Sequence, residues 1–257
     1  MSETRGRILP RRYRWGMCGR YAIDSEVNEA ITAYVHAGGR PQDWRPSDWD
    51  ANYNVAPTNT SVIVRDRVDD DSGEFRREVD WDATWDFRPP WLKTPAPQIN
   101  ARIENLTSSN LWKKAFIGRR AIVPMLGYYE WKTIAGKKQP YFIHSPADFL
   151  SAAGIYVPVK IGDDWDVRFA IITREARDAS GEIHDRMPAF LTPDTWDAWL
   201  SPTDLEDPSG TVDMLMSTSE TVASTITTYP VSKAINNVRA RPVWDDPALL
   251  DPVEVSE

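Results

Sequence analysis

The single cysteine of the chain, Cys18, lies in the stretch MCGRYA at residues 17–22. A cysteine thiolate is a strong nucleophile, and the positive charge of Arg20 favours the thiolate over the thiol. The position directly after Met17 points to a second chemistry, because a cysteine at an N-terminus carries an α-amine next to its thiol. A lone cysteine is more often a small buried hydrophobic residue, so both interpretations stay open.

Two further segments carry groups suited to proton transfer. His184, in IHDRMPAFL (183–191), follows the turn-like residues 179–181, which can present its side chain to a cleft. Glu130, in GYYEWK (127–132), shares one face of a predicted strand with Tyr128, and aromatic surroundings raise the pKa of a carboxyl. The alternatives are a structural histidine and a water-facing glutamate on an edge strand. The other two histidines are interpreted as a structural and a surface residue: His36 and His144.

Turn-rich segments add polar residues of other types. Asn100 and Arg102, in INARIEN (99–105), offer an amide that both donates and accepts and a guanidinium that binds phosphate. Asn54 and Pro57, in NYNVAPT (52–58), predict a turn. For both segments an ordinary structural loop is the alternative.

The hydrophobic pattern predicts a chain dominated by short strands. Residues 88–97 contain four prolines and are expected to be irregular. Helices are predicted over residues 24–36, with Asp24 as the cap, 108–116 and 192–200. Strands are predicted over residues 61–67, 77–85, 120–125, 127–132, 139–144, 152–159, 167–173 and 225–230. We therefore expect one α+β domain with a curved, largely antiparallel, barrel-like sheet and peripheral helices.

Composition narrows the class of protein. The chain has 257 residues, of which 41% are hydrophobic, so it can bury a sizeable core. Its net charge of −8 argues against a general polyanion binder, and any nucleic-acid contact needs a local basic groove. One cysteine excludes an internal disulfide and a thiolate zinc site. With no apolar run of about 18 residues and no secretory signal, we expect a cytoplasmic protein without membrane contact.

Three regions are expected along the chain. We expect residues 1–16 to be a disordered extension or to result from a misassigned start. Residues 17–240 are expected to form the catalytic domain, and residues 241–257 an acidic C-terminal tail.

Eight short segments, in order, resemble the SOS response-associated peptidase (SRAP) family. They are MCGRYA, NYNVAPT, the W-x-x-x-P-x-W element at residues 85–91, NARIE, GYYEWK, KKQPYFI, IHDRMPAFL and PVSKAINNV. Members of this family form a covalent cross-link to abasic sites in single-stranded DNA. The resemblance spans residues 18 to about 238 and implies the same fold and activity here, in the DNA damage (SOS) response, without metal or cofactor and as a monomer.

The resemblance also implies residue roles. The residues matching the family's catalytic positions are Cys18, Asn100, Glu130 and His184. The residues matching its DNA-contacting positions are Arg20, Asn54, Pro57, Trp91, Arg102, Trp131 and Arg186. One departure is Asp86, because a small residue usually follows the first tryptophan of the W-x-x-x-P-x-W element.

The implied chemistry sets a condition on the N-terminus. An α-amine and a thiol on one cysteine convert an aldehyde into a thiazolidine ring, which requires that nothing precede Cys18. We therefore expect translation from Met17 with removal of that methionine, or cleavage after it. Two other functions stay open. One is a cysteine peptidase or N-terminal-nucleophile amidohydrolase that uses Cys18 with His184 and Glu130 on peptide or amide substrates, self-processing after Met17 included. The other is a noncatalytic single-strand DNA binder.

Overall fold

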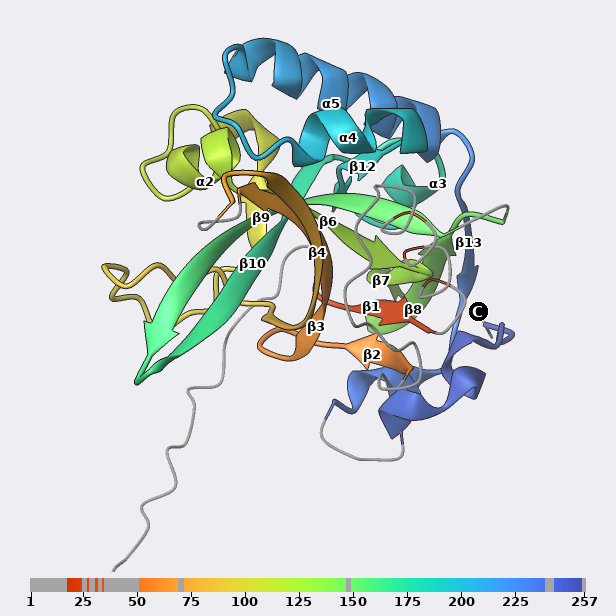
Figure 1. Cartoon of the computed structure of the whole chain (residues 1–257). Helices are drawn as coiled ribbons and strands as arrows, with labels where there is room; N and C mark the ends of the chain where they lie inside the picture. Colours follow the sequence, from red (N-terminus) through yellow and green to blue (C-terminus); the bar gives the residue numbers. More distant parts are fainter. Residues whose placement is uncertain are drawn as a thin grey trace, which may run out of the picture.

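Two β-sheets form the body of the protein (Figure 1). The computed structural model describes residues 18–24, 27, 31, 34, 51–68, 72–146, 149–238 and 243–255. The first sheet has the order β13 (Thr227–Pro230), β8 (Lys137–His144), β7 (Gly127–Ile134), β1 (Tyr21–Ile23) and β2 (Asn52–Val55). The second has the order β11 (Arg186–Pro188), β10 (Asp164–Glu175), β4 (Phe75–Thr84), β3 (Thr60–Val68), β6 (Arg120–Met125), β9 (Leu150–Ile161) and β12 (Phe190–Leu191).

The second sheet closes on itself. β9 and β10 form a hairpin, so the path β10–β4–β3–β6–β9 returns to β10. Neighbours in both sheets are antiparallel except that β10 runs parallel to β4 and to β5 (Asn100–Arg102). Closure leaves few unpaired edges and produces the strong curvature seen in Figure 1. The expected α+β domain with a largely antiparallel, barrel-like core is confirmed.

Helices lie around the sheets rather than between them (Figure 1). The α-helices are α2 (Lys113–Gly118), α3 (Asp178–Gly181), α4 (Trp196–Leu200) and α5 (Pro208–Ala223). The 3-10 turns are η2 (Ile103–Asn105), η3 (Pro193–Thr195), η4 (Lys233–Asn236), η5 (Val243–Asp245) and η6 (Pro247–Leu250). None of the described helices combines the length and apolar character needed to cross a bilayer.

The structure differs from the sequence prediction at two helices, and a third predicted helix lies mostly outside the described residues. Most of residues 24–36 lies outside the described residues, although Val27, Ile31 and Tyr34 are helical. The helix predicted over 108–116 begins later, at Lys113. The 16-residue α5 was not predicted, because its Ser/Thr-rich sequence has no strong apolar stripe. The Asp207 carboxylate caps α5 by accepting from the Gly210 N–H at 2.9 Å.

The C-terminal segment is more closely packed than the expected acidic tail. Leu249 of η6 is buried, and the Val253 N–H donates to the Pro230 carbonyl oxygen at 2.9 Å. Residues 1–16, predicted as an extension, lie outside the described residues.

A buried tryptophan joins the barrel to the first sheet. Trp85 packs edge-on against Tyr21 of β1, with ring centroids 5.1 Å apart, and stacks on Phe169 of β10 at 6.4 Å. Its indole N–H donates to the Ile99 carbonyl oxygen at 2.9 Å. This tryptophan therefore fixes the two ends of the segment 85–99 relative to β1.

Arg120 provides a test of the barrel's outer packing. Its buried guanidinium donates to the carbonyl oxygens of Trp199 at 2.7 Å, Phe116 at 3.1 Å and Thr203 at 3.2 Å, and also to those of Ile117 and Ser201.

Arg120→Met leaves these buried acceptors unpaired, so we expect a loss of about 3 kcal/mol in unfolding free energy. Arg119→Met, at a half-buried neighbour, should cost less than about 1 kcal/mol. Equal losses in urea unfolding would contradict this assignment.

Candidate functional site

The register between β1 and β7 brings the only cysteine to the glutamate of GYYEWK. Tyr21 pairs with Tyr128, and the Tyr129 N–H donates to the Arg20 carbonyl oxygen at 3.0 Å. Because the strands are antiparallel, the residues before β1 run beside those that follow Tyr128. Cys18 and Glu130, separated by more than a hundred residues in sequence, are thus neighbours.

Glu130 is a buried carboxyl beside a backbone nitrogen. Its side chain is 4% exposed, and Oε1 accepts no hydrogen bond from any described residue. Burial raises the pKa of Glu130 to about 8, although hydrogen bonds from the backbone N–H groups of Cys18 and Trp131 act in the opposite direction. The carboxyl therefore holds a proton at neutral pH and can both give and take one there.

Cys18 is enclosed and uncharged in the full-length chain. Burial, and secondarily the charge of Glu130, raise the pKa of the Cys18 thiol well above its usual value. The Asn100 side-chain Nδ2 donates to the Cys18 carbonyl oxygen at 3.2 Å. Asn100 begins β5, which is held parallel to β10 through the Ile171–Asn100 pair. The second sheet thus orients the backbone of Cys18, while Glu130 of the first sheet faces its nitrogen.

His184 lies at the end of the loop that follows β10. Its backbone N–H donates to the Ser180 carbonyl oxygen at 3.0 Å. Its Nδ1 is 3.1 Å from the Arg186 backbone N–H and 3.0 Å from Asp185 Oδ1. Nδ1 therefore has a backbone donor and a carboxylate acceptor within hydrogen-bond distance and can use one of them at a time.

Two arginines line a cavity of about 520 Å³ next to this loop. Arg102 is exposed, at the end of β5. Arg186, on β11, donates to Glu104 through Nη1 at 2.6 Å and Nη2 at 3.1 Å, and to the Thr173 carbonyl oxygen at 2.7 Å. Burial acts to raise the pKa of Glu104, but the hydrogen bond and charge of Arg186 outweigh it and lower that pKa. Arg102 is thus the more available cation, and Arg186 is already matched by a carboxylate.

Arg20 and Trp131 form a stacked pair on the other sheet. The Arg20 guanidinium lies 5.9 Å from the centroid of the Trp131 ring, and its Nε has no partner among the described residues. The Trp131 indole N–H donates to Asn236 Oδ1 at 2.9 Å. Burial lowers the pKa of Arg20, consistent with a guanidinium only partly reached by water.

Asn54 supports this pair through the residues on either side of Asn236, whereas Pro57 lies in a turn next to Trp85. The buried Asn54 donates through Nδ2 to the carbonyl oxygens of Ile235 and Asn237, both at 3.1 Å. These contacts hold the residues flanking Asn236. Pro57 is half-buried in a turn that brings the Thr58 N–H to the Trp85 carbonyl oxygen at 3.0 Å.

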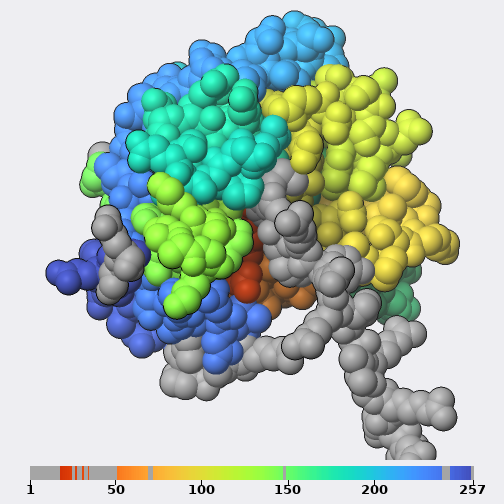
Figure 2. All heavy atoms as spheres, turned by 180° about the vertical axis from the view of Figure 1, so that it is seen from behind, coloured from red at the N-terminus to blue at the C-terminus, as the bar shows by residue number. Residues whose placement is uncertain are grey.

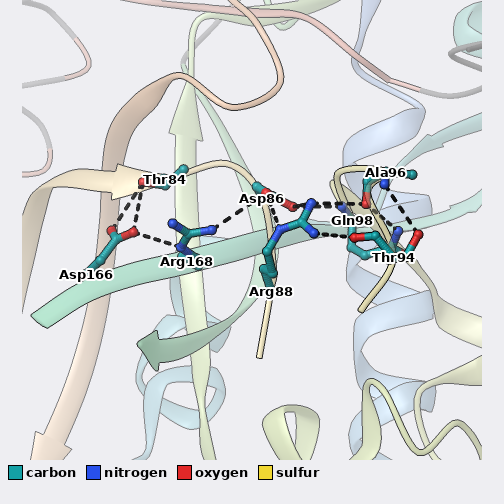
Figure 3. Close-up of polar contacts among 8 residues, drawn as sticks. All are labelled: Thr84, Asp86, Arg88, Thr94, Ala96, Gln98, Asp166 and Arg168. Atoms are coloured by element: carbon teal, nitrogen blue, oxygen red, sulfur yellow. Dashed lines mark hydrogen bonds and ion pairs between the residues drawn. The ribbon is translucent and has the colours of Figure 1, made fainter. Parts of the chain in front are cut away.

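Asp86 organises the irregular loop that carries Trp91 (Figure 3). It is 5% exposed, and its Oδ2 accepts from Arg88 Nε at 2.9 Å while its Oδ1 accepts from the Gln98 N–H at 3.0 Å. Arg168 of β10 lies 3.8 Å away. The carboxylate thus joins the two ends of the loop, and Trp91, 57% exposed, stands out from it. The departure noted at position 86 is compensated by these partners.

Other groups lie apart from this site. His144 stacks on Phe142 and contacts Thr227, and His36 lies outside the described residues. Within the described part of the chain, no three or more His, Cys, Asp and Glu side chains are arranged to hold a metal ion. In Figure 2 the N-terminal segment (red) is visible between the β7–β8 region (green) and the residues after position 51 (orange), where the two sheets meet.

Sequence reasoning missed two groups at this site. Glu104 belongs to the segment NARIE, and its spacing from Arg102 gave no indication that it would pair with Arg186. The arginines that neutralise Asp86 come from its own loop and from β10, so only the fold brings the second of them close.

The raised pKa of Glu130 predicts a pH dependence of stability. Its usual pKa is 4.5 and folding raises it to about 8, so the folded protein holds a proton that the unfolded chain releases. This linkage lowers stability as pH rises through that window. Glu130→Gln lacks it, so its unfolding free energy should gain roughly 3 kcal/mol over the wild type between pH 5 and pH 8.

Urea unfolding at several pH values measures this difference. Glu206→Gln, at an exposed position, should follow the wild-type curve. A constant difference between Glu130→Gln and the wild type across pH 5–8 would show that the carboxyl titrates normally.

Comparison with known proteins places the chain. Residues 17–238 match the family described as SOS response associated peptidase (SRAP). The chain is 33% identical over 231 residues to the abasic site processing protein YedK of Escherichia coli, covering 87% of this chain and 96% of that protein. It is 30% identical over 249 residues to the abasic site processing protein YoqW of Bacillus subtilis, covering 91% and 99%. A 37% identical match over 158 residues to the yeast abasic site processing protein YMR114C spans 58% of this chain and 40% of the yeast protein.

Solved structures agree with this placement. A protein from Bacteroides thetaiotaomicron has the same fold, with a TM-score of 0.67 at 20% identity over 92% of this chain and all of that chain. A phage-related protein from Bordetella bronchiseptica has a TM-score of 0.58 at 26% identity, over 84% and 95%. The chain belongs to the SOS response-associated peptidase family.

Proposed function

We propose that this protein captures abasic sites in single-stranded DNA by forming a thiazolidine between Cys18 and the ring-opened sugar. The observation that carries the proposal is the buried Glu130 carboxyl, which faces the backbone nitrogen of the only cysteine. The relatives named as abasic site processing proteins, two of which match nearly end to end, support DNA carrying this lesion as the substrate.

The chemistry uses both functional groups of a terminal cysteine. The α-amine attacks the aldehyde carbon C1′ of the open sugar, and loss of one water gives an imine. The thiol then adds across the C=N bond, sulfur to carbon and proton to nitrogen, closing a five-membered ring. The net change is the loss of one water, with no oxidation or reduction.

Glu130 suits the proton transfers of this sequence. A carboxyl with a pKa of about 8 can take a proton from the attacking amine and return it to the departing hydroxyl near neutral pH. Asn100 holds the Cys18 carbonyl oxygen, so the cysteine backbone stays fixed while its nitrogen reacts. His184, whose Nδ1 lies near both a donor and an acceptor, is proposed to assist imine formation and its reversal.

DNA contact is proposed along the same face. Arg102 and Arg186 would bind phosphates flanking the lesion, with Arg186 exchanging or sharing its Glu104 partner. Trp91 and the Arg20–Trp131 pair offer surfaces on which bases stack. Each phosphate that these cations neutralise releases counterions from the DNA, so binding should weaken as the salt concentration rises.

The proposed chemistry requires a free α-amine on Cys18. While residues 1–17 are attached, the Cys18 nitrogen is an amide and cannot form the ring. Translation from Met17 with removal of that methionine would free this nitrogen; where residues 1–17 are translated, we propose a second activity, cleavage after Met17 by the protein itself, with Cys18 as nucleophile and Glu130 and His184 as proton carriers.

A denaturing gel tests the main proposal. Single-stranded DNA with one abasic site is mixed with residues 1–257, with residues 18–257 bearing a free Cys18, and with the shorter form carrying Cys18→Ala. We expect a heat-stable shifted band for the free-Cys18 form, and for the full chain only in the fraction that mass spectrometry shows to have lost residues 1–17. No shifted band from any form at low or high salt would refute the cross-linking function.

The two arginines should differ in their effect on DNA binding. Arg102→Ala removes one exposed phosphate contact, so the slope of log affinity against log salt for single-stranded DNA should fall in magnitude by about 0.7. Arg186→Ala also leaves Glu104 without its counter-charge next to the DNA and should weaken binding further. Lys160→Ala, an equal charge change on the β9–β10 hairpin, should leave the slope unchanged. Equal slopes for Arg102→Ala and Lys160→Ala would exclude Arg102 from the DNA contact.

A further inference from the structure

A pair of buried hydroxyl groups links β7 to the loop that carries His184. The Tyr128 hydroxyl and Ser180 Oγ form a hydrogen bond, and both residues are almost completely buried. Tyr128 lies two residues before Glu130 on β7, and Ser180 lies in α3. Neither residue belongs to the set that the proposed chemistry uses directly.

The loop that contains Ser180 is closed at its base and depends on Ser180 inside it. The Ala176 N–H donates to the Asp185 carbonyl oxygen at 2.9 Å and joins the two ends. The Ser180 carbonyl oxygen accepts from the N–H groups of both Ile183 and His184, each at 3.0 Å. The position of Ser180 therefore sets the position of the His184 backbone.

The loop contains a residue with a strained backbone, so a contact from outside the loop is needed to stabilise its conformation. Asp178 has φ of +51°, a left-handed conformation that costs a non-glycine residue about 1 kcal/mol or more. A buried hydrogen bond from a strand of the sheet can hold such a loop in one arrangement. Tyr128 comes from the strand that also supplies Glu130, so it relates the loop to the acid group directly.

We propose that the Tyr128–Ser180 hydrogen bond is a positioning contact that holds His184 in register with Glu130 and Cys18. The inference rests on the proposed function for its catalytic consequence, whereas its structural consequence is independent of DNA. Tyr128→Phe removes one oxygen atom from a well-packed ring and keeps its shape.

The first test is amide hydrogen exchange of the unreacted full-length protein, followed by mass spectrometry on the peptide covering residues 178–186. Tyr128→Phe should speed exchange of this peptide by about tenfold. Tyr129→Phe is the matched control, because it removes an equally buried hydroxyl that donates to the Tyr53 carbonyl oxygen at 2.7 Å. It should leave this peptide unchanged. Unchanged exchange in Tyr128→Phe would overturn the inference.

The second test separates positioning from general stability. Cross-linking to single-stranded DNA with one abasic site is timed at saturating DNA, using protein with Cys18 at its N-terminus. Tyr128→Phe should slow the reaction about tenfold with DNA affinity within about twofold of the wild type. In a His184→Gln background the same change should have no further effect, since a residue that acts through His184 cannot act without it.

Results against the positioning role can be told apart from results against the proposed function. Equal slowing by Tyr128→Phe with and without His184 would overturn the positioning role, as would equal slowing by Tyr129→Phe. Absence of cross-linking by the wild type would overturn the proposed function itself, and the exchange comparison would then decide alone whether the contact holds the loop.

Discussion

The burial of Glu130 against the backbone nitrogen of Cys18 is the constraint on which the site depends. A carboxyl removed from water and given few hydrogen bonds keeps its proton to about pH 8. The energetic cost of that burial is borne by two sheets that pack around it, one supplying Glu130 and the other Asn100. The same burial keeps the thiol of Cys18 protonated in the full-length chain, so attack by that thiol requires a base beside it.

Three arginines around this centre lie in three different environments. Arg102 is exposed, Arg186 is matched by Glu104, and Arg20 lies on Trp131. Although the protein has an overall net charge of −8, this local placement of arginines provides positive charge where DNA contact is proposed. Two aromatic residues differ in the same way: Trp85 is fully buried in the core, whereas Trp91 is exposed on a loop that the ion pairs of Asp86 hold together.

Much of the fold was predictable because a strongly apolar pattern in the sequence marks a buried strand. Strand β6 has the predicted bounds, and β8 and β10 extend beyond the predicted bounds by two or three residues at an end. Helix α5 escaped prediction because capping and packing, rather than an apolar stripe, define it. A raised pKa for Glu130 was one of two interpretations of its aromatic neighbours, and the burial of its side chain agrees with that interpretation. The Glu104–Arg186 pair and the Tyr128–Ser180 contact were not, because each joins segments more than 50 residues apart.

The most direct test of the account is the mass of the DNA-linked peptide after protease digestion of the cross-linked product. The account predicts a peptide that begins at Cys18, carries the sugar with the loss of one water, contains no free thiol, and forms without a reducing agent. A sugar attached to a lysine, or to Cys18 with its thiol still free to react with an alkylating reagent, would contradict the thiazolidine and remove the reason for placing Glu130 at the centre of the chemistry.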